Sequence, residues 1–368
     1  MSTTPTTGKD RSEAGGGYTP ASYTRIRKDR PRVEAELVFL ISQPRAGSTH
    51  LQHLIAAHPD VHAPLAPDGP PRGETWLLLH PVYALRARGW EAEYAAQQAR
   101  NGLGGFLATL PGGDEDYFAA LRRGYGYLYE RALEGTSARI FLDKVPRYYL
   151  IIPELQRIFP EARFVFLLRH PLAVLCSIMT TWVGDSLIQL QNFRTDLLDA
   201  PGLLLEGIDS VGEQGYVVRY ETFVNEPQPE LQRLCQWLGI DFDPTVLDGE
   251  VQPLPGGTYA DRASPFGRPD PARGCGWTQE LASPQLWRLV SDYLSALGPA
   301  TMASLGYDPG ESEEIVAATR PPPRQLRATF GLSAILDDSS PRSRLRRGSL
   351  LSRLRWKAER LTGMGGHR

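Results

Sequence analysis

The chain has 368 residues, of which 41% are hydrophobic, so it can bury a sizeable core in one large or two ordinary domains. Its net charge of −2 argues against a nucleic acid partner, and its three widely spaced cysteines argue against a disulfide framework or a zinc ribbon. We expect a cytoplasmic protein, because the sequence shows no signal peptide and no apolar run near the ~20 residues of a membrane span.

Composition divides the chain into three parts. Residues 1–33 are rich in Thr, Gly, Ser and charge, which is typical of a disordered arm. Residues 34–310 are expected to form the globular domain, and residues 311–368 a linker followed by a basic amphipathic tail. Nine Lys or Arg against one Glu give residues 340–368 a net charge of about +8. Three uses of this tail stay open: an anionic membrane, which would make the protein peripheral there, an acidic partner protein, or no partner at all.

The first strongly patterned stretch predicts an anion site. Residues 38–41 form an apolar run typical of a buried strand, a Pro-Arg-Ala-Gly turn follows, and an amphipathic helical pattern covers residues 48–57. The free N–H groups and the dipole at a helix N-terminus favour a phosphate. Gly47 lets the backbone approach that phosphate closely, and Arg45 adds a permanent positive charge.

The turn departs from the commonest phosphate-binding loop. The Walker motif G-x-x-x-x-G-K-[ST] requires a Lys that this turn lacks. Its P-R-x-G-S-T sequence instead resembles the phosphosulfate-binding loop of the sulfotransferases that use 3′-phosphoadenosine 5′-phosphosulfate (PAPS). A strand, turn and helix without a ligand is the simpler interpretation of this segment taken alone. The resemblance implies that the 5′-phosphosulfate is held by Arg45, Ala46, Gly47, Ser48 and Thr49.

Several polar residues follow this helix. His50, His53, His58 and His62 lie close together, but no acidic or thiol partner completes a set of ligands, so we expect no metal site. Glu74 comes where a loop rich in Pro and Gly returns to a helix start, and a carboxylate there can simply stabilise the helix dipole. By the family resemblance, Glu74 corresponds to the general base that takes a proton from the acceptor.

Residues 101–114 contain five glycines and are expected to form a mobile loop that covers the acceptor. A strand over residues 138–143 follows. Its final Asp143 would suit a carboxylate on Mg²⁺, which is the best argument for a nucleotide kinase. By the resemblance, Lys144 stabilises negative charge on the oxygen between sulfur and phosphorus. Alternatively, Lys144 and Arg147 are surface cations that cap the edge of the sheet.

The continuous apolar run of residues 164–168 predicts a central parallel strand. Arg169 follows it at the carboxyl end, where open α/β sheets bind ligands, and Pro171 is a favoured first residue of the next helix. Ser177 alone is weak evidence, because most serines within helices bond their own backbone. The R-[HN]-P-x(5)-S pattern resembles the element that binds the donor's 3′-phosphate in sulfotransferases, which implies this role for Arg169 and Ser177.

Two later segments carry weaker parts of the resemblance. Tyr220, at the end of a short strand, corresponds to a tyrosine that reaches the adenine region, although an ordinary half-buried tyrosine explains it nearly as well. Arg273, with Gly274 beside it, corresponds to a segment that folds over the 3′-phosphate. Arg262 and Arg268 are the alternatives for that role.

Together these features predict one P-loop-like α/β domain, with a central parallel sheet of four or five strands flanked by helices on both faces. Two phosphate motifs on neighbouring strand ends imply a nucleotide phosphorylated at its 5′ and 3′ positions, unlike ATP or GTP. The resemblance implies a sulfotransferase that moves the sulfuryl group from PAPS to a hydroxyl of a small-molecule, lipid or carbohydrate acceptor. Its catalytic residues would be Glu74, Lys144 and Arg45, with no metal. A P-loop kinase and a non-catalytic nucleotide-binding protein are the alternatives.

Overall fold

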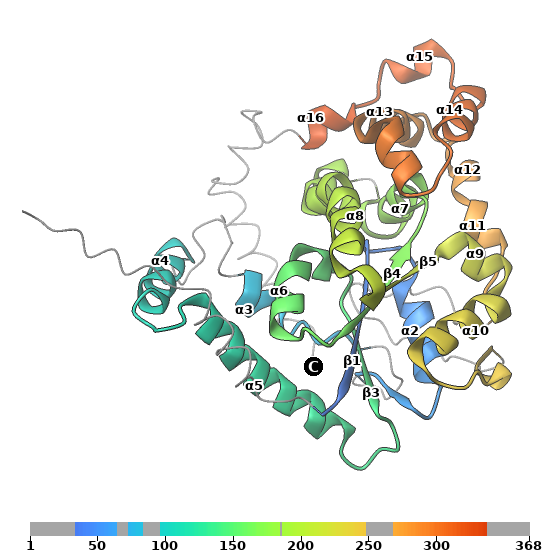
Figure 1. Ribbon diagram of the computed structural model, residues 1–368. Helices are drawn as coiled ribbons and strands as arrows, with labels where there is room; N and C mark the ends of the chain where they lie inside the picture. Colours follow the sequence, from blue (N-terminus) through green and yellow to red (C-terminus); the bar gives the residue numbers. More distant parts are fainter. Residues whose placement is uncertain (1–33, 65–72, 84–95, 185, 248–267, 337–368) are drawn as a thin grey trace, which may run out of the picture.

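The computed structural model describes residues 34–64, 73–83, 96–184, 186–247 and 268–336 (Figure 1). The expected N-terminal arm and basic tail lie outside these residues. Among the helices of the described ranges, none is long and apolar enough to span a membrane.

Five parallel strands form the central sheet, which confirms the predicted architecture. Their order is β2-β3-β1-β4-β5, so β1 lies in the middle with β3 and β4 as its neighbours. Near-continuous apolar runs build these strands because a parallel sheet is covered on both faces. The sequence did not predict β2, which has two residues and therefore no pattern. The strands are β1 (Glu36–Ser42), β2 (Val61–His62), β3 (Ile140–Lys144), β4 (Arg163–Leu168) and β5 (Gly215–Arg219).

Helices lie on both sides of this sheet (Figure 1). The α-helices are α2 (Ser48–Ala56), α3 (Leu79–Tyr83), α4 (Ala96–Leu107), α5 (Asp114–Leu133), α6 (Ile152–Ile158), α7 (Pro171–Ile178), α8 (Ala200–Val211), α9 (Tyr220–Asn225), α10 (Pro227–Leu238), α11 (Ala272–Cys275), α12 (Trp277–Glu280), α13 (Pro284–Ser304), α14 (Pro309–Ala318), α15 (Pro323–Leu326) and α16 (Leu332–Leu336). The 3₁₀-helices are η1 (Pro146–Leu150), η3 (Leu187–Phe193), η5 (Gly212–Gln214) and η6 (Pro244–Leu247). Two π-helical segments are η2 (Met179–Val183) and η4 (Thr195–Asp199).

Side chains alternate between the two faces of the sheet. Phe39 and Phe141 belong to the core shared with α5, α6 and α8, whereas Leu40 and Leu142 belong to the core shared with α2, α9 and α10. Figure 1 shows these two groups of helices on opposite sides of the strands. The same alternation sends Asp143 and its neighbour Lys144 to opposite faces of β3, and this difference determines their roles at the site.

Residues 309–336 correct the expectation of a linker. They form α14, α15 and α16, and Figure 1 shows these helices beside α13 at one end of the molecule. Val316, Leu332, Ile335 and Leu336 are buried in a third apolar core, together with residues of α7 and α13. The globular part therefore continues past residue 310 to Leu336, because short apolar segments that look like a linker in the sequence are buried against α13.

Part of the expected mobile loop over residues 101–114 is helical, while residues 108–113 form turns between α4 and α5. Helix α4 continues through Gly102, Gly104 and Gly105 as far as Leu107, which is buried. A Cβ added at any of these three glycines would meet no atom within 4 Å, so no close contact requires them. Each glycine costs a helix ~1 kcal/mol relative to alanine, which is why the sequence favoured a loop here, whereas the structure has a helix in contact with α5.

Candidate active site

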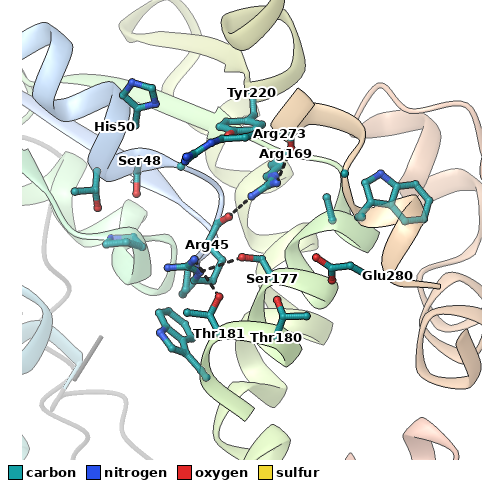
Figure 2. A pocket seen from close by; sticks show the side chains of 18 of the residues that line it. Arg45, Ser48, His50, Arg169, Ser177, Thr180, Thr181, Tyr220, Arg273 and Glu280 are labelled. Carbon is teal, nitrogen blue, oxygen red and sulfur yellow. Dashed lines mark hydrogen bonds between the residues drawn. The ribbon is translucent and has the colours of Figure 1, made fainter. Parts of the chain in front are cut away.

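A cavity of about 780 Å³ lies at the carboxyl end of the sheet, beside the β1–α2 loop and the end of β4 (Figure 2). Its wall is built from this loop, from residues 74–76, from α7 and η2, and from the start of α9 together with α11 and α12. Four segments predicted separately from the sequence therefore meet at one place. The predicted site residues that line the cavity are Arg45, Gly47, Ser48, Thr49, Glu74, Arg169, Ser177, Tyr220 and Arg273.

The predicted phosphate loop has the backbone of an anion site. Helix α2 begins at Ser48, as predicted, and Gly47 precedes it in the left-handed region with φ 98°. A Cβ on Gly47 would lie 2.5 Å from Cε2 of Tyr220, so this position requires glycine for both its conformation and its close contact. The N–H groups of Ser48 and Thr49 are the first two of α2, where no preceding turn offers an intrahelical acceptor, whereas the N–H of His50 donates to the carbonyl of Gly47. The start of α2 can therefore receive an anion at its partially positive end, while the ring of Tyr220 occupies the space beside Gly47.

Arg45 connects the loop to the helix that follows β4. Its Nε donates to Oγ of Ser177 over 3.1 Å, and its Nη2 donates to Oγ1 of Thr181 over 3.2 Å (Figure 2). The guanidinium also lies 5.1 Å from the ring centroid of Trp182. Arg45 has a positive φ of 70°, a conformation that costs a non-glycine residue roughly 1–3 kcal/mol. Contacts from two elements thus hold this strained arginine in the cavity wall.

Arg169 forms hydrogen bonds with both the predicted phosphate loop and the segment that contains Arg273. Its Nη1 donates to the carbonyl of Arg45 over 2.9 Å, and its Nη2 donates to the carbonyl of Arg273 over 3.0 Å (Figure 2). The guanidinium stacks on Tyr220 at 4.4 Å from the ring centroid. Nε of Arg169 is buried without a hydrogen-bond partner in the described part of the chain. One strong donor of this permanent cation is therefore left for a ligand.

Glu74 and Lys144 form an ion pair at the edge of the cavity. Nζ of Lys144 donates to Oε1 of Glu74 over 2.5 Å and to Oγ1 of Thr49 over 3.1 Å. The side chain of Lys144 is 1% exposed, whereas that of Glu74 is 28% exposed. Lys144 therefore lies behind the carboxylate and the loop hydroxyl, and Glu74 presents the accessible group. The alternative of a surface cation does not fit such a buried lysine.

Asp143 belongs to the opposite face of β3 and does not line the cavity. Its carboxylate is fully buried and accepts hydrogen bonds from the hydroxyls of Thr75, Tyr129 and Tyr148. Burial raises the pKa of Asp143, although these three hydroxyl groups act in the opposite direction. Because this carboxylate is buried and already accepts three hydrogen bonds, it is not placed to hold Mg²⁺ in the cavity. The kinase hypothesis required that role of Asp143, so the structure argues against it.

Two more predicted residues lie outside the cavity wall. Ala46 is fully buried in the core beneath α2, and its N–H donates to the carbonyl of Gln43. Gly274 packs against α9, where an added Cβ would lie 3.5 Å from Val224. Of the alternatives to Arg273, Arg268 is exposed and Arg262 lies outside the described residues.

The structure adds residues that sequence reasoning missed or treated as surface. Arg147, expected at most to cap the sheet edge, lines the cavity and pairs with buried Asp196 through both Nε (2.9 Å) and Nη2 (2.7 Å). Thr181 follows Ser177 at a spacing of four residues, so its place beside Ser177 could have been inferred from the period of an α-helix. Trp182 follows at five residues and comes from the π-helical segment η2, which the sequence did not predict. Trp76 is 42% exposed at the cavity and has φ 54°.

Two titratable groups near Arg169 have shifted pKa values. Burial, with a smaller effect of the Arg169 charge, lowers the pKa of His170 to about 4. Burial raises the pKa of Glu280, and the charge of Arg169 opposes this rise. Glu280 lines the cavity, and its Oε2 is buried without a hydrogen-bond partner in the described part of the protein. Within the described ranges, no three His, Cys, Asp or Glu gather as metal ligands.

Comparison with known proteins gives a family for this arrangement. The model of the Sulfotransferase family matches residues 38–244, which contain both phosphate motifs, Glu74 and Lys144. Nodulation protein NoeE of Sinorhizobium fredii is 30% identical over 239 residues, which are 59% of this chain and 53% of that protein. A putative protein-tyrosine sulfotransferase of Caenorhabditis briggsae is 23% identical over 58% of this chain and 68% of that protein. The chain thus spans about half the length of NoeE.

Solved sulfotransferase structures are also similar to this chain. The sulfotransferase domain from the curacin biosynthetic pathway is 20% identical, with a TM-score of 0.43 over 66% of this chain and 90% of that one. A sulfotransferase from Alicyclobacillus acidocaldarius is 17% identical, with a TM-score of 0.41 over 75% of this chain and 98% of that one.

Proposed function

Because this chain belongs to the sulfotransferase family, we propose that it transfers the sulfuryl group of PAPS to a hydroxyl group of a small-molecule, lipid or carbohydrate acceptor. The observation that carries this proposal is the meeting of two anion sites in one cavity. The α2 N-terminus with Gly47 is one of them, and Arg169 with Ser177 is the other. A nucleotide with phosphates at both ends suits such a pair.

The residues present fit this donor. Nε of Arg169 is buried and keeps a donor available, and the ring of Tyr220 lies over Gly47, between the two sites. Ser48 and Thr49 line the cavity at the start of α2, where the helix dipole favours negative charge. We assign the 5′-phosphosulfate to Arg45, Gly47, Ser48 and Thr49, and the 3′-phosphate to Arg169, Ser177 and Arg273. Tyr220 would contact the nucleoside.

Catalysis would combine one base with positive charge near the leaving phosphate. When bound, the donor supplies a sulfuryl group whose bond to the phosphate oxygen breaks as the acceptor oxygen bonds to sulfur. Glu74 would take the proton of the acceptor hydroxyl, since it is the exposed member of its ion pair. Lys144 and Arg45 would stabilise the charge that develops on the oxygen between sulfur and phosphorus, and Lys144 would also hold Glu74 and Thr49 in place. Positioning and electrostatics would therefore supply most of the rate.

Calorimetric titration with adenosine 3′,5′-bisphosphate, ADP and Mg-ATP tests the donor. We expect the bisphosphate to bind at least about 30-fold more tightly than ADP, because a phosphate on a desolvated arginine contributes about 2 kcal/mol or more. Preference for Mg-ATP would overturn the proposal. Transfer of ³⁵S from labelled PAPS to sugars, lipid alcohols and tyrosine peptides then tests turnover. Bisphosphate binding without transfer to any of these would favour the non-catalytic alternative.

A further inference from the structure

Two neighbouring residues of β3, Asp143 and Lys144, form hydrogen bonds with two neighbouring residues of the segment that carries Glu74. Lys144 donates to Glu74, as described above, and Asp143 accepts from Thr75. Oγ1 of Thr75 lies 2.8 Å from Oδ1 and 2.9 Å from Oδ2 of this carboxylate. Because β3 sends its two side chains to opposite faces, the Glu74 segment is held from both sides of the strand end.

The carboxylate of Asp143 is itself rigidly held. Tyr129 of α5 donates to Oδ2 over 2.7 Å, and Tyr148 of η1 donates to the same oxygen over 2.9 Å. Asp143 is 1% exposed, and both tyrosines are buried in the same core as Phe39. A buried acceptor with three hydroxyl donors cannot move without losing hydrogen bonds that water cannot replace. Thr75 is therefore attached to a fixed point of the core.

The backbone next to Thr75 is strained. Trp76 has φ 54°, which is uncommon for a bulky residue and costs roughly 1–3 kcal/mol. The hydroxyl of Thr75 accepts a hydrogen bond from the N–H of Leu77 over 3.3 Å. This hydrogen bond therefore joins the two residues on either side of Trp76. On the other side, Gln52 of α2 donates to the carbonyl of Gly73 over 3.1 Å. Such strain persists where the surrounding contacts fix the segment from several directions.

We propose that Thr75, fixed by Asp143, is a positioning residue that sets the place of the Glu74 carboxylate relative to the phosphate loop. This inference rests on the proposed function in assigning Glu74 as the base. Thr75 touches no reacting atom in this scheme and acts through its neighbour. Loss of its hydroxyl would leave Glu74 paired with Lys144 but free to shift, and a shift near 1 Å can lower a rate by about 100-fold.

A purely structural role makes a different prediction. If the hydroxyl only satisfied a buried carboxylate, removing any of its three donors would lower stability similarly and leave the chemistry alone. Tyr129 gives the matched control, because it donates to the same carboxylate from α5, outside the Glu74 segment, and because Tyr148 still donates to the same oxygen when Tyr129 is removed. The three variants to compare are therefore Thr75→Val, Thr75→Ser and Tyr129→Phe. Thr75→Ala serves as a second hydroxyl-free variant if Thr75→Val does not fold.

The experiment has a kinetic and a spectroscopic measurement. For Thr75→Val we expect kcat for sulfuryl transfer to fall about 10- to 100-fold, with bisphosphate affinity within about twofold of wild type. Thr75→Ser should restore kcat, and Tyr129→Phe should keep it within about threefold although its Tm falls. Combined with Glu74→Gln, Thr75→Val should cause no further loss, because both changes act through one group.

The ¹³C chemical shift of the Glu74 carboxyl carbon, assigned by its loss in Glu74→Gln, reports on the same contact without turnover. It should move in Thr75→Val and stay in place in Thr75→Ser and Tyr129→Phe. An unmoved resonance in Thr75→Val, or an equal loss of kcat in Tyr129→Phe, would overturn the inference. If wild type transfers no sulfuryl group, the proposed function fails, yet the chemical shift still decides whether Thr75 positions Glu74.

Discussion

The two halves of the cavity differ in the partners of their charged groups. The half that we propose for the donor (the donor half) comprises the β1–α2 loop and the end of β4, and it contains a helix N-terminus and the buried Nε of Arg169, which has no hydrogen-bond partner in the described residues. The half that we propose for the acceptor (the acceptor half) comprises Glu74, Trp76, Pro146 and Arg147, and its charged groups have oppositely charged partners. Glu74 pairs with Lys144, and Arg147 pairs with Asp196. Trp76 lines the same half and is partly exposed.

This difference has a consequence for recognition. A site in which a cationic N–H lacks an acceptor selects a ligand by charge, whereas a site whose charges are paired internally selects by shape and by the few groups left exposed. We therefore expect substitutions in the donor half to change donor affinity, and substitutions in the acceptor half to change kcat or the acceptor KM. The following variants test that separation, from the largest expected effect to the smallest.

Glu74→Gln should lower kcat by about 10³-fold, within the range of general-base catalysis, because the amide cannot accept the acceptor's proton. Its affinity for adenosine 3′,5′-bisphosphate, measured by calorimetry, should stay within about twofold of wild type. Glutamine retains the shape of the side chain and can still contact Lys144, so the fold should be preserved. Loss of donor binding in this variant would contradict the assignment of Glu74 to the acceptor half.

Arg169→Ala should weaken bisphosphate binding by about 100-fold, or roughly 2.7 kcal/mol, because a charged, partly desolvated contact is lost. Arg163→Ala is the matched control, since Arg163 begins the same strand at the end away from the cavity. Arg163 contacts Glu36 and the carbonyl of Leu238, so its loss should reduce stability but leave calorimetric affinity unchanged. Equal losses of affinity in both variants would point to a general effect on β4.

The donor half was the more predictable one, for a physical reason. Arg169 directly follows an apolar strand, and Arg45 lies three residues after the end of another, so local pattern alone places both at the carboxyl edge of a parallel sheet. The contacts of the acceptor half join residues far apart in the chain, such as Thr75 with Asp143 and Arg147 with Asp196. No local pattern reports such pairs, because they depend on tertiary packing. The same limit explains why residues 311–336 looked like a linker.

The stability of the folded protein should depend on pH through His170, the residue that follows Arg169. Its pKa is about 4 in the folded protein and near 6.5 in an unfolded chain, so the unfolded state binds more protons between these values. Stability should therefore fall as the pH drops below 6.5, by about 2 kcal/mol at pH 5 from this residue.

Urea unfolding at pH 7 and pH 5 measures the effect. In His170→Asn, the loss of stability between these two pH values should be smaller by that amount. Asparagine can still cap α7 by accepting from the N–H of Leu172, as Nδ1 of His170 does. An unchanged pH dependence in His170→Asn would assign the acid sensitivity to other groups.

Trp76→Gly should have the smallest effect, and this effect should be confined to binding of the acceptor. Glycine adopts positive φ without strain, and this relief offsets the greater freedom of glycine in the unfolded chain, so stability should change by less than about 1 kcal/mol. Loss of the exposed ring from the acceptor half should raise the acceptor KM by up to about tenfold, while bisphosphate affinity stays constant. Trp76→Phe keeps a ring and should stay near wild type. A lower donor affinity in Trp76→Gly would mean that the two halves share this side chain, because a ring that served the acceptor alone could not alter bisphosphate binding.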